Sequence, residues 1–130
     1  MNKVTVIGSG RVGSTIVYSL TCRGLADEIV LIDINGDRAL GEALDIRQGL
    51  SYDSASRVYA GTYEDAKGSD IVIITSGIAR KPGQSRLELI KTNISIQESI
   101  IPEITKAAPD AVYIMVSNPV DILTYSFCKL

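Results

Sequence analysis

The chain of 130 residues contains no histidine, no tryptophan, one phenylalanine and only two cysteines. Histidine is the commonest acid–base group near neutral pH, so chemistry that needs one would have to draw it from outside this stretch. Cys22 and Cys128 form no C-x-x-C pair, which argues against a disulfide framework and favours a reducing, cytoplasmic location. We expect both cysteines to be buried or half-buried as small apolar side chains.

The chain also lacks an excess of positive charge and any long apolar run. A formal net charge of −2 argues against nucleic acid as a partner. No stretch has the length of a membrane span, and no signal-peptide pattern is present. With 45% hydrophobic residues, residues 1–130 suit one domain with its own core. Because the sequence stops inside the helical pattern of "NPVDILTYSFCKL", we expect this domain to be part of a longer enzyme.

Short apolar, β-branched runs predict five strands, at residues 3–8, 28–34, 57–61, 70–77 and 111–119, and the first two are typical of buried strands. Helical spacing predicts helices at 11–24, 36–50 and 86–108. The second helix carries Leu40, Ala43, Leu44 and Ile46 on or near one face, and Pro102 should bend or break the third near Ser99. Wholly apolar strands that alternate with helices are typical of a doubly wound α/β fold, a parallel sheet covered on both faces.

A glycine-rich loop, "VIGSGRVGS", joins the first strand to the first helix. Its glycines have G-x-G-x-x-G spacing in the strand–helix context that a dinucleotide-binding loop requires. Gly8 permits the tight turn, Gly10 lets the backbone approach a pyrophosphate, and Gly13 lets the helix pack closely on the strand. Free N–H groups and the helix dipole then favour an anion; the alternative is a turn that binds nothing. The predicted cofactor loop comprises Gly8, Ser9, Gly10, Arg11, Val12 and Gly13.

Asp33 ends the second predicted strand. A carboxylate at this place can accept hydrogen bonds from an adenosine ribose and repels a 2′-phosphate, which favours NAD over NADP. The alternative role for Asp33 is to cap the N-terminus of the next helix. Asp33 therefore joins the predicted cofactor-binding residues.

The whole chain resembles the lactate/malate dehydrogenase family. Six motifs carry this resemblance, and they occur in the order of the family: "VIGSGRVGS", "GLADEIVLIDI", "GEALDI", "SDIVIITSG", "RKPGQSRLELIKTN" and "VSNPVDI". The resemblance implies a Rossmann-type sheet of strand order 3-2-1-4-5, without the family's sixth strand. It implies a second, catalytic domain that supplies the histidine–aspartate relay, so no catalytic residue is expected in this chain. It also implies a cis Asn118–Pro119 bond and a homodimer or homotetramer.

The resemblance gives roles to the basic segment after the fourth predicted strand. In the family this segment is a loop that closes over the substrate. Arg86 matches the arginine that polarises the keto oxygen, and Arg80 matches the position that reads the far end of the substrate. Malate dehydrogenases place arginine at this second position, and lactate dehydrogenases typically place glutamine. A guanidinium can hold a second carboxylate through two charge-assisted hydrogen bonds; the alternative is an ordinary solvated loop.

Two asparagines complete the expected site. Asn93 resembles the family asparagine beside the cofactor, with a surface or capping role as the alternative. Asn118 matches the asparagine that contacts the substrate, and its neighbours Val116 and Ser117 match backbone contacts to the nicotinamide ribose. These three residues end the fifth predicted strand at its carboxyl edge, where open parallel sheets bind ligands. For Asn118 the alternative is a helix N-cap.

The sequence therefore favours the NAD-binding part of a malate dehydrogenase, an oxidoreductase of the tricarboxylic acid cycle, inactive as this chain alone. Its substrate would be a small dicarboxylic 2-hydroxy or 2-keto acid, with no metal. Gln84 and "SRLEL" resemble lactate enzymes as much as malate enzymes. L-lactate dehydrogenase or another 2-hydroxyacid dehydrogenase is therefore the first alternative. A stand-alone dinucleotide-binding module without catalysis is the second.

Overall fold

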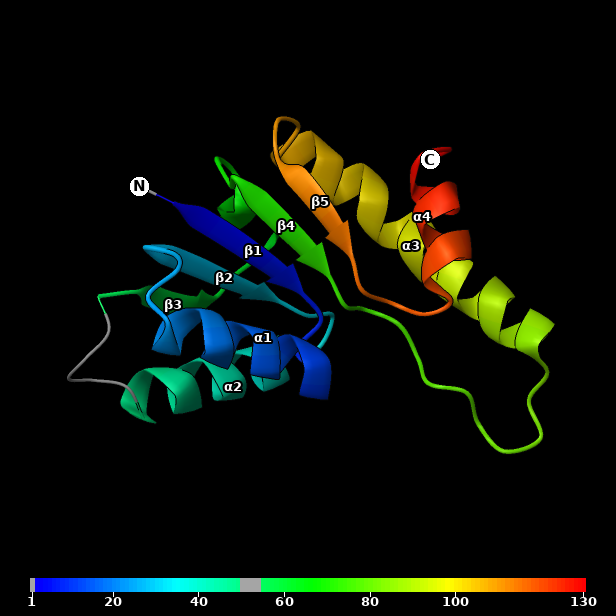
Figure 1. Cartoon of the computed structure of the whole chain (residues 1–130), viewed down its shortest axis with the longest axis horizontal. Coiled ribbons are helices and arrows are strands. Elements are labelled where there is room, and N and C mark those ends of the chain that lie inside the picture. Colours follow the sequence, from blue (N-terminus) through cyan, green and yellow to red (C-terminus); the bar gives the residue numbers. More distant parts are fainter. Residues whose placement is uncertain (1, 50–54) are drawn as a thin grey trace.

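The computed structural model describes residues 2–49 and 55–130, which form one parallel sheet with helices on both faces (Figure 1). The strands are β1 (Lys3–Ile7), β2 (Glu28–Ile32), β3 (Arg57–Ala60), β4 (Ile71–Ile74) and β5 (Val112–Met115). The helices are α1 (Arg11–Cys22), α2 (Gly36–Gly49), α3 (Arg86–Ala107) and α4 (Val120–Phe127), with the 3-10 helix η1 (Tyr63–Ala66). The sheet order β3-β2-β1-β4-β5 confirms the predicted order and fold class.

Strand β1 lies at the centre of the sheet and pairs in parallel with both β2 and β4. In this register Val6 stands opposite Leu31 on one side and Ile73 on the other. Val6 and Leu31 are fully buried, and burying an aliphatic side chain of this size contributes about 1.5–3 kcal/mol. The continuous apolar runs of β1, β2 and β4 are therefore explained by burial on both faces of these strands, whereas Val112 and Ile114 of the edge strand β5 are exposed.

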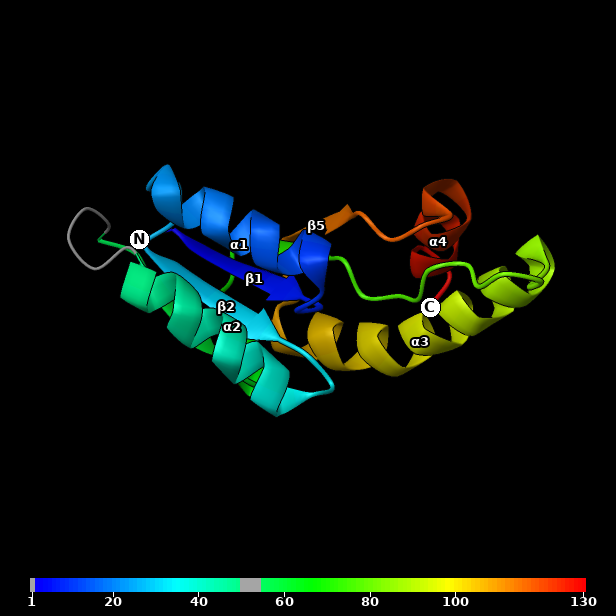
Figure 2. The ribbon, with the colours of Figure 1, turned by 90° about the horizontal axis from the view of Figure 1, so that it is seen from below.

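Each face of the sheet has its own apolar core, and Figures 1 and 2 show the helices on either side. Val17 of α1 and Ala39 and Ala43 of α2 pack on the face that also presents Leu31. The opposite face is covered by η1 and α3. The N-terminal half of α3 extends beyond the sheet, where α4 lies beside it (Figure 1). The carboxyl ends of all five strands consequently meet at one edge, between the two helical layers.

Helix α2 turns a different face to the sheet from the one the leucine spacing indicated. Ala39, Ala43 and Ile46 are buried, whereas Leu40 and Leu44 are 49% and 39% exposed. The small alanines let the helix lie close to the strands, and the larger leucines point outward. The prediction was therefore right for Ala43 and Ile46 and wrong for the leucines.

The prediction for the two cysteines was wrong, because Cys22 and Cys128 are both exposed. Each stands at or just beyond the C-terminal end of a helix, on the side away from the core. Their apolar character therefore did not decide their position.

Pro102 does not break α3, which continues to Ala107. Pro102 and Glu98 lie on the exposed side of the helix. Pro102 has no N–H to donate to the Glu98 carbonyl, but water can satisfy that carbonyl on this side. On the inner side Ile101 and Ile104 are buried, at 2% and 0% exposed. Burial therefore keeps the helix together across the proline, and the predicted break was wrong.

A polar cluster joins three strands at the amino end of the sheet. The Glu28 carboxylate accepts a hydrogen bond of 2.5 Å from the Tyr59 hydroxyl and lies 3.2 Å from Lys3 Nζ. The Tyr59 bond, more than the charge of Lys3, holds the pKa of Glu28 below its usual value against the effect of burial. Burial, together with the same bond, raises the pKa of Tyr59 to about 12.

We predict that Tyr59→Phe lowers the free energy of unfolding by about 1 kcal/mol at pH 7. The lowered pKa of Glu28 gives a contribution that is present above its unfolded value and is lost as the pH falls through the folded value. The gap between the variant and the native chain should therefore narrow in acid. Urea unfolding of both proteins at pH 7 and at lower pH values measures the difference in their free energies of unfolding.

Tyr113→Phe is the matched control, because the Tyr113 hydroxyl donates to the neutral backbone carbonyls of Ile104 and Ala108. Its cost should not depend on pH. A Tyr59→Phe gap that stays constant in acid would contradict the role given to Glu28.

Candidate functional site

The predicted site residues come from four segments that end at the carboxyl edge of the sheet. Gly8 follows β1, Asp33 follows β2 and Ser117 lies two residues after β5, while Thr75, which the sequence did not predict as a site residue, follows β4. Because β1 pairs with both β2 and β4, the chain leaves β1 and β4 in opposite directions at this edge. Such a switch point is where open α/β sheets bind ligands.

The glycine loop is fixed by contacts that leave no space for a side chain at Gly8 or Gly13. Gly8 has φ +103°, and its N–H donates to Ile32 O at 2.7 Å. A Cβ on Gly13 would lie 1.7 Å from Gly8 O, so α1 can pack on the end of β1 only without one. Thr75 Oγ1 donates to Ile7 O at 3.0 Å and Gly8 O at 3.1 Å, which holds the loop against β4.

The N-terminus of α1 provides the features that favour an anion. Gly10 is the N-cap and carries no capping side chain, and the first turn contains no acidic residue. Nothing lies within 4 Å of the place where a Cβ on Gly10 would stand, so a ligand can approach the backbone there. Arg11 and Val12 open the helix and are exposed. The free N–H groups and the helix dipole therefore point at open space beside a positive side chain.

Asp33 is held by three hydrogen bonds at the end of β2. Its Oδ2 accepts from Ser9 N at 2.6 Å and from Ser9 Oγ at 2.8 Å, and its Oδ1 accepts from Asn35 N at 2.9 Å. Burial raises the pKa of Asp33, but these bonds and the charge of Arg38 outweigh it and leave the pKa below its usual value. Asp33 is therefore an ionised acceptor beside the glycine loop.

The capping role considered for Asp33 belongs to Asn35. Asn35 Oδ1 accepts from Arg38 N at 3.1 Å, and Asn35 O accepts from Ala39 N at 3.1 Å at the start of α2. Asp33 stands before this cap, partly exposed. The structure thus leaves the carboxylate of Asp33 available for another partner.

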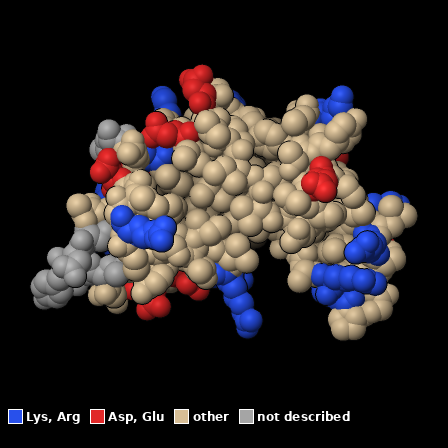
Figure 3. All heavy atoms as spheres, in the orientation of Figure 1, with Lys and Arg blue, Asp and Glu red and all other residues tan. Residues whose placement is uncertain are grey.

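Arg80 and Arg86 lie beyond the sheet edge: Arg80 is on the segment between β4 and α3, and Arg86 is the first residue of α3. Arg80 is exposed, and its Nε donates to Gln84 O at 2.9 Å across a turn in which Gly83 has φ +80°. Arg86 opens α3 just after Ser85, whose capping box with Glu88 fixes the helix start. Lys and Arg side chains gather at this end of the molecule, at the lower right of Figure 3. The fold therefore places both arginines on one exposed segment beside the edge.

Asn93 connects the start of that segment to the turn after β5. Asn93 is 2% exposed; its Oδ1 accepts from Ile78 N at 2.9 Å, and its Nδ2 donates to Asn118 O at 2.8 Å. The surface role considered for Asn93 is excluded by this burial. Its contact with a cofactor remains a prediction.

The turn after β5 has the predicted cis bond between Asn118 and Pro119. Ser117 is buried, and its Oγ donates to Ser76 O at 2.6 Å. Pro119, not Asn118, is the N-cap of α4, so the capping alternative for Asn118 was wrong. Val116 packs beside the core and Asn118 is exposed at the edge. These residues lie where a ligand at the edge would meet them, and their binding roles remain predictions.

Sequence reasoning did not find three residues of this edge. Thr75 fastens the loop, Ile34 is 107% exposed directly after Asp33, and Tyr63 of η1 lies near Asp33. Burial raises the pKa of Tyr63, and the charges of Glu103 and Asp33 raise it further. The sequence offered one signal for Ile34: it is a strongly apolar residue directly after Asp33, the acidic residue that follows the buried strand β2.

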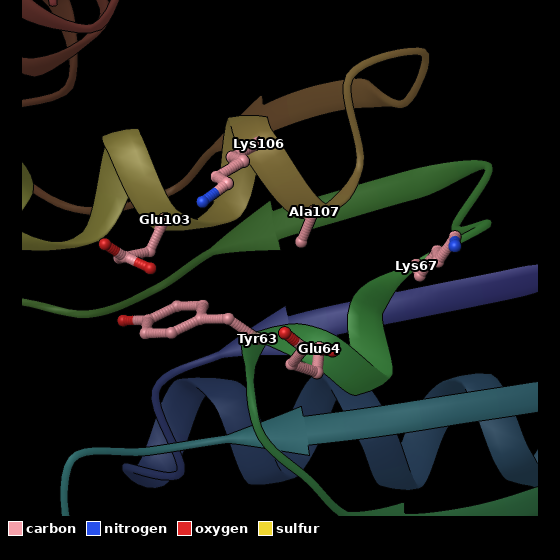
Figure 4. Close-up of a pocket in the computed structure, with 6 residues that line it drawn as sticks. All are labelled: Tyr63, Glu64, Lys67, Glu103, Lys106 and Ala107. Carbon is pink, nitrogen blue, oxygen red and sulfur yellow. The ribbon is translucent and has the colours of Figure 1, made fainter.

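A groove of about 270 Å³ lies between η1 and the end of α3 (Figure 4). Tyr63 and Glu64 line it from η1 and Glu103 and Lys106 from α3, so it mixes both signs of charge. Within residues 2–49 and 55–130 no group of three or more His, Cys, Asp or Glu side chains could hold a metal ion. No helix in those ranges is long and apolar enough to cross a membrane.

The same fold is found in known dehydrogenases. A family model described as the lactate/malate dehydrogenase NAD-binding domain matches residues 2–130. The chain belongs to the lactate/malate dehydrogenase family. This family consists of NAD-dependent oxidoreductases, so NAD is the cofactor of this domain and the family prediction is confirmed.

Several relatives of known name resemble the whole chain. L-lactate dehydrogenase of Thermoanaerobacter pseudethanolicus is 52% identical over 130 residues, which are 100% of this chain and 42% of the relative. L-lactate dehydrogenase 1 of Clostridium acetobutylicum is 53% identical over 128 residues, 98% of this chain and 41% of the relative. The chain thus spans about two-fifths of the length of these relatives.

Solved structures of both enzyme types superpose on the domain. The minor L-lactate dehydrogenase of Enterococcus mundtii has a TM-score of 0.93 at 43% identity and covers 98% of this chain and 41% of its own. Malate dehydrogenase of Archaeoglobus fulgidus, in complex with NADH, has a TM-score of 0.92 at 39% identity. The match covers 98% of this chain and 44% of the malate dehydrogenase chain. The fold therefore does not separate lactate from malate enzymes.

We predict that Gly13→Ala costs about 3 kcal/mol or more of stability and abolishes NADH binding, because the backbone at Gly8 must move to admit a methyl group. Gly41→Ala is the control: Gly41 lies inside α2 with nothing within 4 Å of its Cβ position. That variant should gain about 0.5–1 kcal/mol. Thermal unfolding and NADH fluorescence measure both; native-like binding by Gly13→Ala would exclude the close packing described.

Proposed function

We propose that the complete protein is an NAD-dependent dehydrogenase of a small 2-hydroxy acid, with L-lactate and pyruvate as the first candidate pair. The observation that carries this proposal is the similarity of the whole chain to L-lactate dehydrogenases, at 52% and 53% identity. This similarity fits the lactate alternative better than the malate function that the sequence favoured, and malate is not confirmed. A cytoplasmic location is part of the same proposal.

The described residues fit the parts of a dinucleotide. The exposed N–H groups at the start of α1 suit the pyrophosphate, and the open space at Gly10 admits it. Asp33 accepts a ribose hydroxyl. Ile34, fully exposed beside Asp33, offers an apolar surface to the adenine ring. The nicotinamide supplies the hydride acceptor, while these residues bind and orient the cofactor.

Arg80 supports the second candidate pair, malate and oxaloacetate. Its guanidinium is exposed on the segment beside the edge, and its Nε is bonded to a backbone carbonyl. A substrate with a second carboxylate would give this charge a bidentate partner in a closed site. Pyruvate would bring a methyl group to the same place. Similarity over the whole chain and the chemistry of this one side chain therefore favour different substrates.

Because this chain contains no histidine, the proton-transfer step of the proposed reaction needs a group from elsewhere in the protein. Reduction of a keto group needs a proton donor for the oxygen as well as a hydride for the carbon. In this chain Arg86 is the proposed partner of the keto oxygen, which it would polarise by charge. We therefore assign the proton relay to the part of the protein beyond this chain.

Apolar surface on the outer elements supports a larger assembly. Leu40 and Leu44 of α2 are exposed, as are Val112 and Ile114 of β5, at 63% and 43%. Apolar side chains that are exposed on one domain can be covered by another protein surface. This agrees with a second domain and with the proposed homodimer or homotetramer.

We predict that the complete protein binds NAD at least about tenfold more tightly than NADP, which corresponds to about 1.4 kcal/mol. Asp33→Ala should narrow this ratio, because it removes both the ribose acceptor and the charge that opposes a 2′-phosphate. Asp37→Ala, which removes an exposed carboxylate from the first turn of α2, should leave the ratio unchanged. Calorimetry with both cofactors decides; equal affinity of the native protein for NADP would refute the role of Asp33.

For the substrate, we predict that the complete enzyme has the higher kcat/KM with pyruvate, and that Arg80→Gln raises this preference over oxaloacetate by about tenfold or more. Arg86→Gln should reduce turnover of both acids, and Lys81→Gln, on the same exposed loop, should change little. Steady-state kinetics of the four proteins with both acids gives the answer. If the native enzyme prefers oxaloacetate and Arg80→Gln removes that preference, the proposed substrate would be malate and not lactate.

A further inference from the structure

We infer that Ser9 is a positioning residue, whose hydroxyl orients the Asp33 carboxylate so that only Oδ1 remains to receive the cofactor ribose. The inference rests on the proposed cofactor site. Ser9 was expected to be a cofactor-binding residue of the glycine loop. The geometry instead gives it an indirect role through Asp33, and thereby a part in the choice between NAD and NADP.

The hydrogen bonds at Asp33 divide its two oxygens. A carboxylate oxygen accepts about two hydrogen bonds. Oδ2 already accepts two, from Ser9 N at 2.6 Å and Ser9 Oγ at 2.8 Å. Oδ1 accepts one, from Asn35 N at 2.9 Å. One acceptor position therefore remains, on Oδ1, and it suits the O–H of a ribose.

Ser9 has no further hydrogen-bond donor to offer the cofactor, because its N–H and its O–H both donate to Asp33. Its side chain is 0% exposed and its single hydroxyl proton is donated to Asp33. Its carbonyl accepts from Ser14 Oγ at 3.0 Å. Alanine at position 9 would keep the backbone bond to Oδ2 and lose only the hydroxyl bond, so the carboxylate could turn about its remaining contacts.

The same arrangement acts on the charge of Asp33. Two hydrogen bonds from Ser9 help to keep the pKa of Asp33 below its usual value in spite of burial. A carboxylate held ionised and in one orientation repels a 2′-phosphate at a fixed place. Loss of the hydroxyl should therefore weaken NAD binding and weaken the discrimination against NADP together.

The test is a double-mutant cycle on the complete protein, with NAD and NADP binding measured by calorimetry. Ser9→Ala should weaken NAD binding about tenfold, as expected for a hydrogen bond to a charged group, and should narrow the ratio of NAD to NADP affinity. In an Asp33→Ala background the same change should alter NAD affinity by less than about twofold.

Ser14→Ala is the matched control, because it removes a hydroxyl bond to the same loop that does not reach Asp33. It should leave the NAD to NADP ratio unchanged. Carbon-13 NMR titration of the Asp33 carboxyl in the cofactor-free protein adds a second measurement. The pKa should rise in Ser9→Ala and stay in place in Ser14→Ala, which a general loosening of the loop would not produce.

Equal effects of Ser9→Ala and Ser14→Ala on the ratio would overturn the inference. So would a tenfold loss that persists in the Asp33→Ala background, or an unchanged Asp33 pKa in Ser9→Ala. These results leave the proposed cofactor site in place, because the native protein would still bind NAD. Failure of the native protein to bind NAD would overturn the cofactor site and the inference together.

Discussion

The cofactor edge depends on the close contact between α1 and the end of β1. At Gly13 a single Cβ would stand 1.7 Å from Gly8 O, so the helix reaches this position only because the side chain is absent. That contact directs the N-terminus of α1 at the space above the sheet, while Gly8 N–H and Thr75 Oγ1 fix the loop to β2 and β4. The site is therefore built by backbone packing, and the side chains around it refine what it binds.

The sequence was sufficient for the fold because its signals are local and agree with one another. Continuous apolar runs such as 70–77 predict strands buried on both faces, and the spacing of Gly8, Gly10 and Gly13 predicts the loop. The sequence was not sufficient where two opposing effects act on the same element. Alanines displaced Leu40 and Leu44 from the inner face of α2, and burial on both sides of Pro102 outweighed its missing hydrogen bond.

The site shows the same limit. Asp33 was recognised, but its partner Ser9 Oγ and the cap at Asn35 depend on side-chain directions that spacing does not define. The substrate is harder to predict from the sequence. Similarity over the whole chain reflects common descent, whereas the choice of substrate would depend on one side chain, Arg80. Relatives of both enzyme types share this fold with TM-scores of 0.93 and 0.92, so the backbone cannot decide between them.

A crystal structure of the complete protein with NADH tests the central claim most directly. The account predicts pyrophosphate oxygens within hydrogen-bond distance of the N–H groups that open α1, and a ribose hydroxyl on Asp33 Oδ1 with Ser9 Oγ still bound to Oδ2. NADH seated instead in the groove beside Tyr63 and Glu103, or a pyrophosphate remote from the glycine loop, would contradict it.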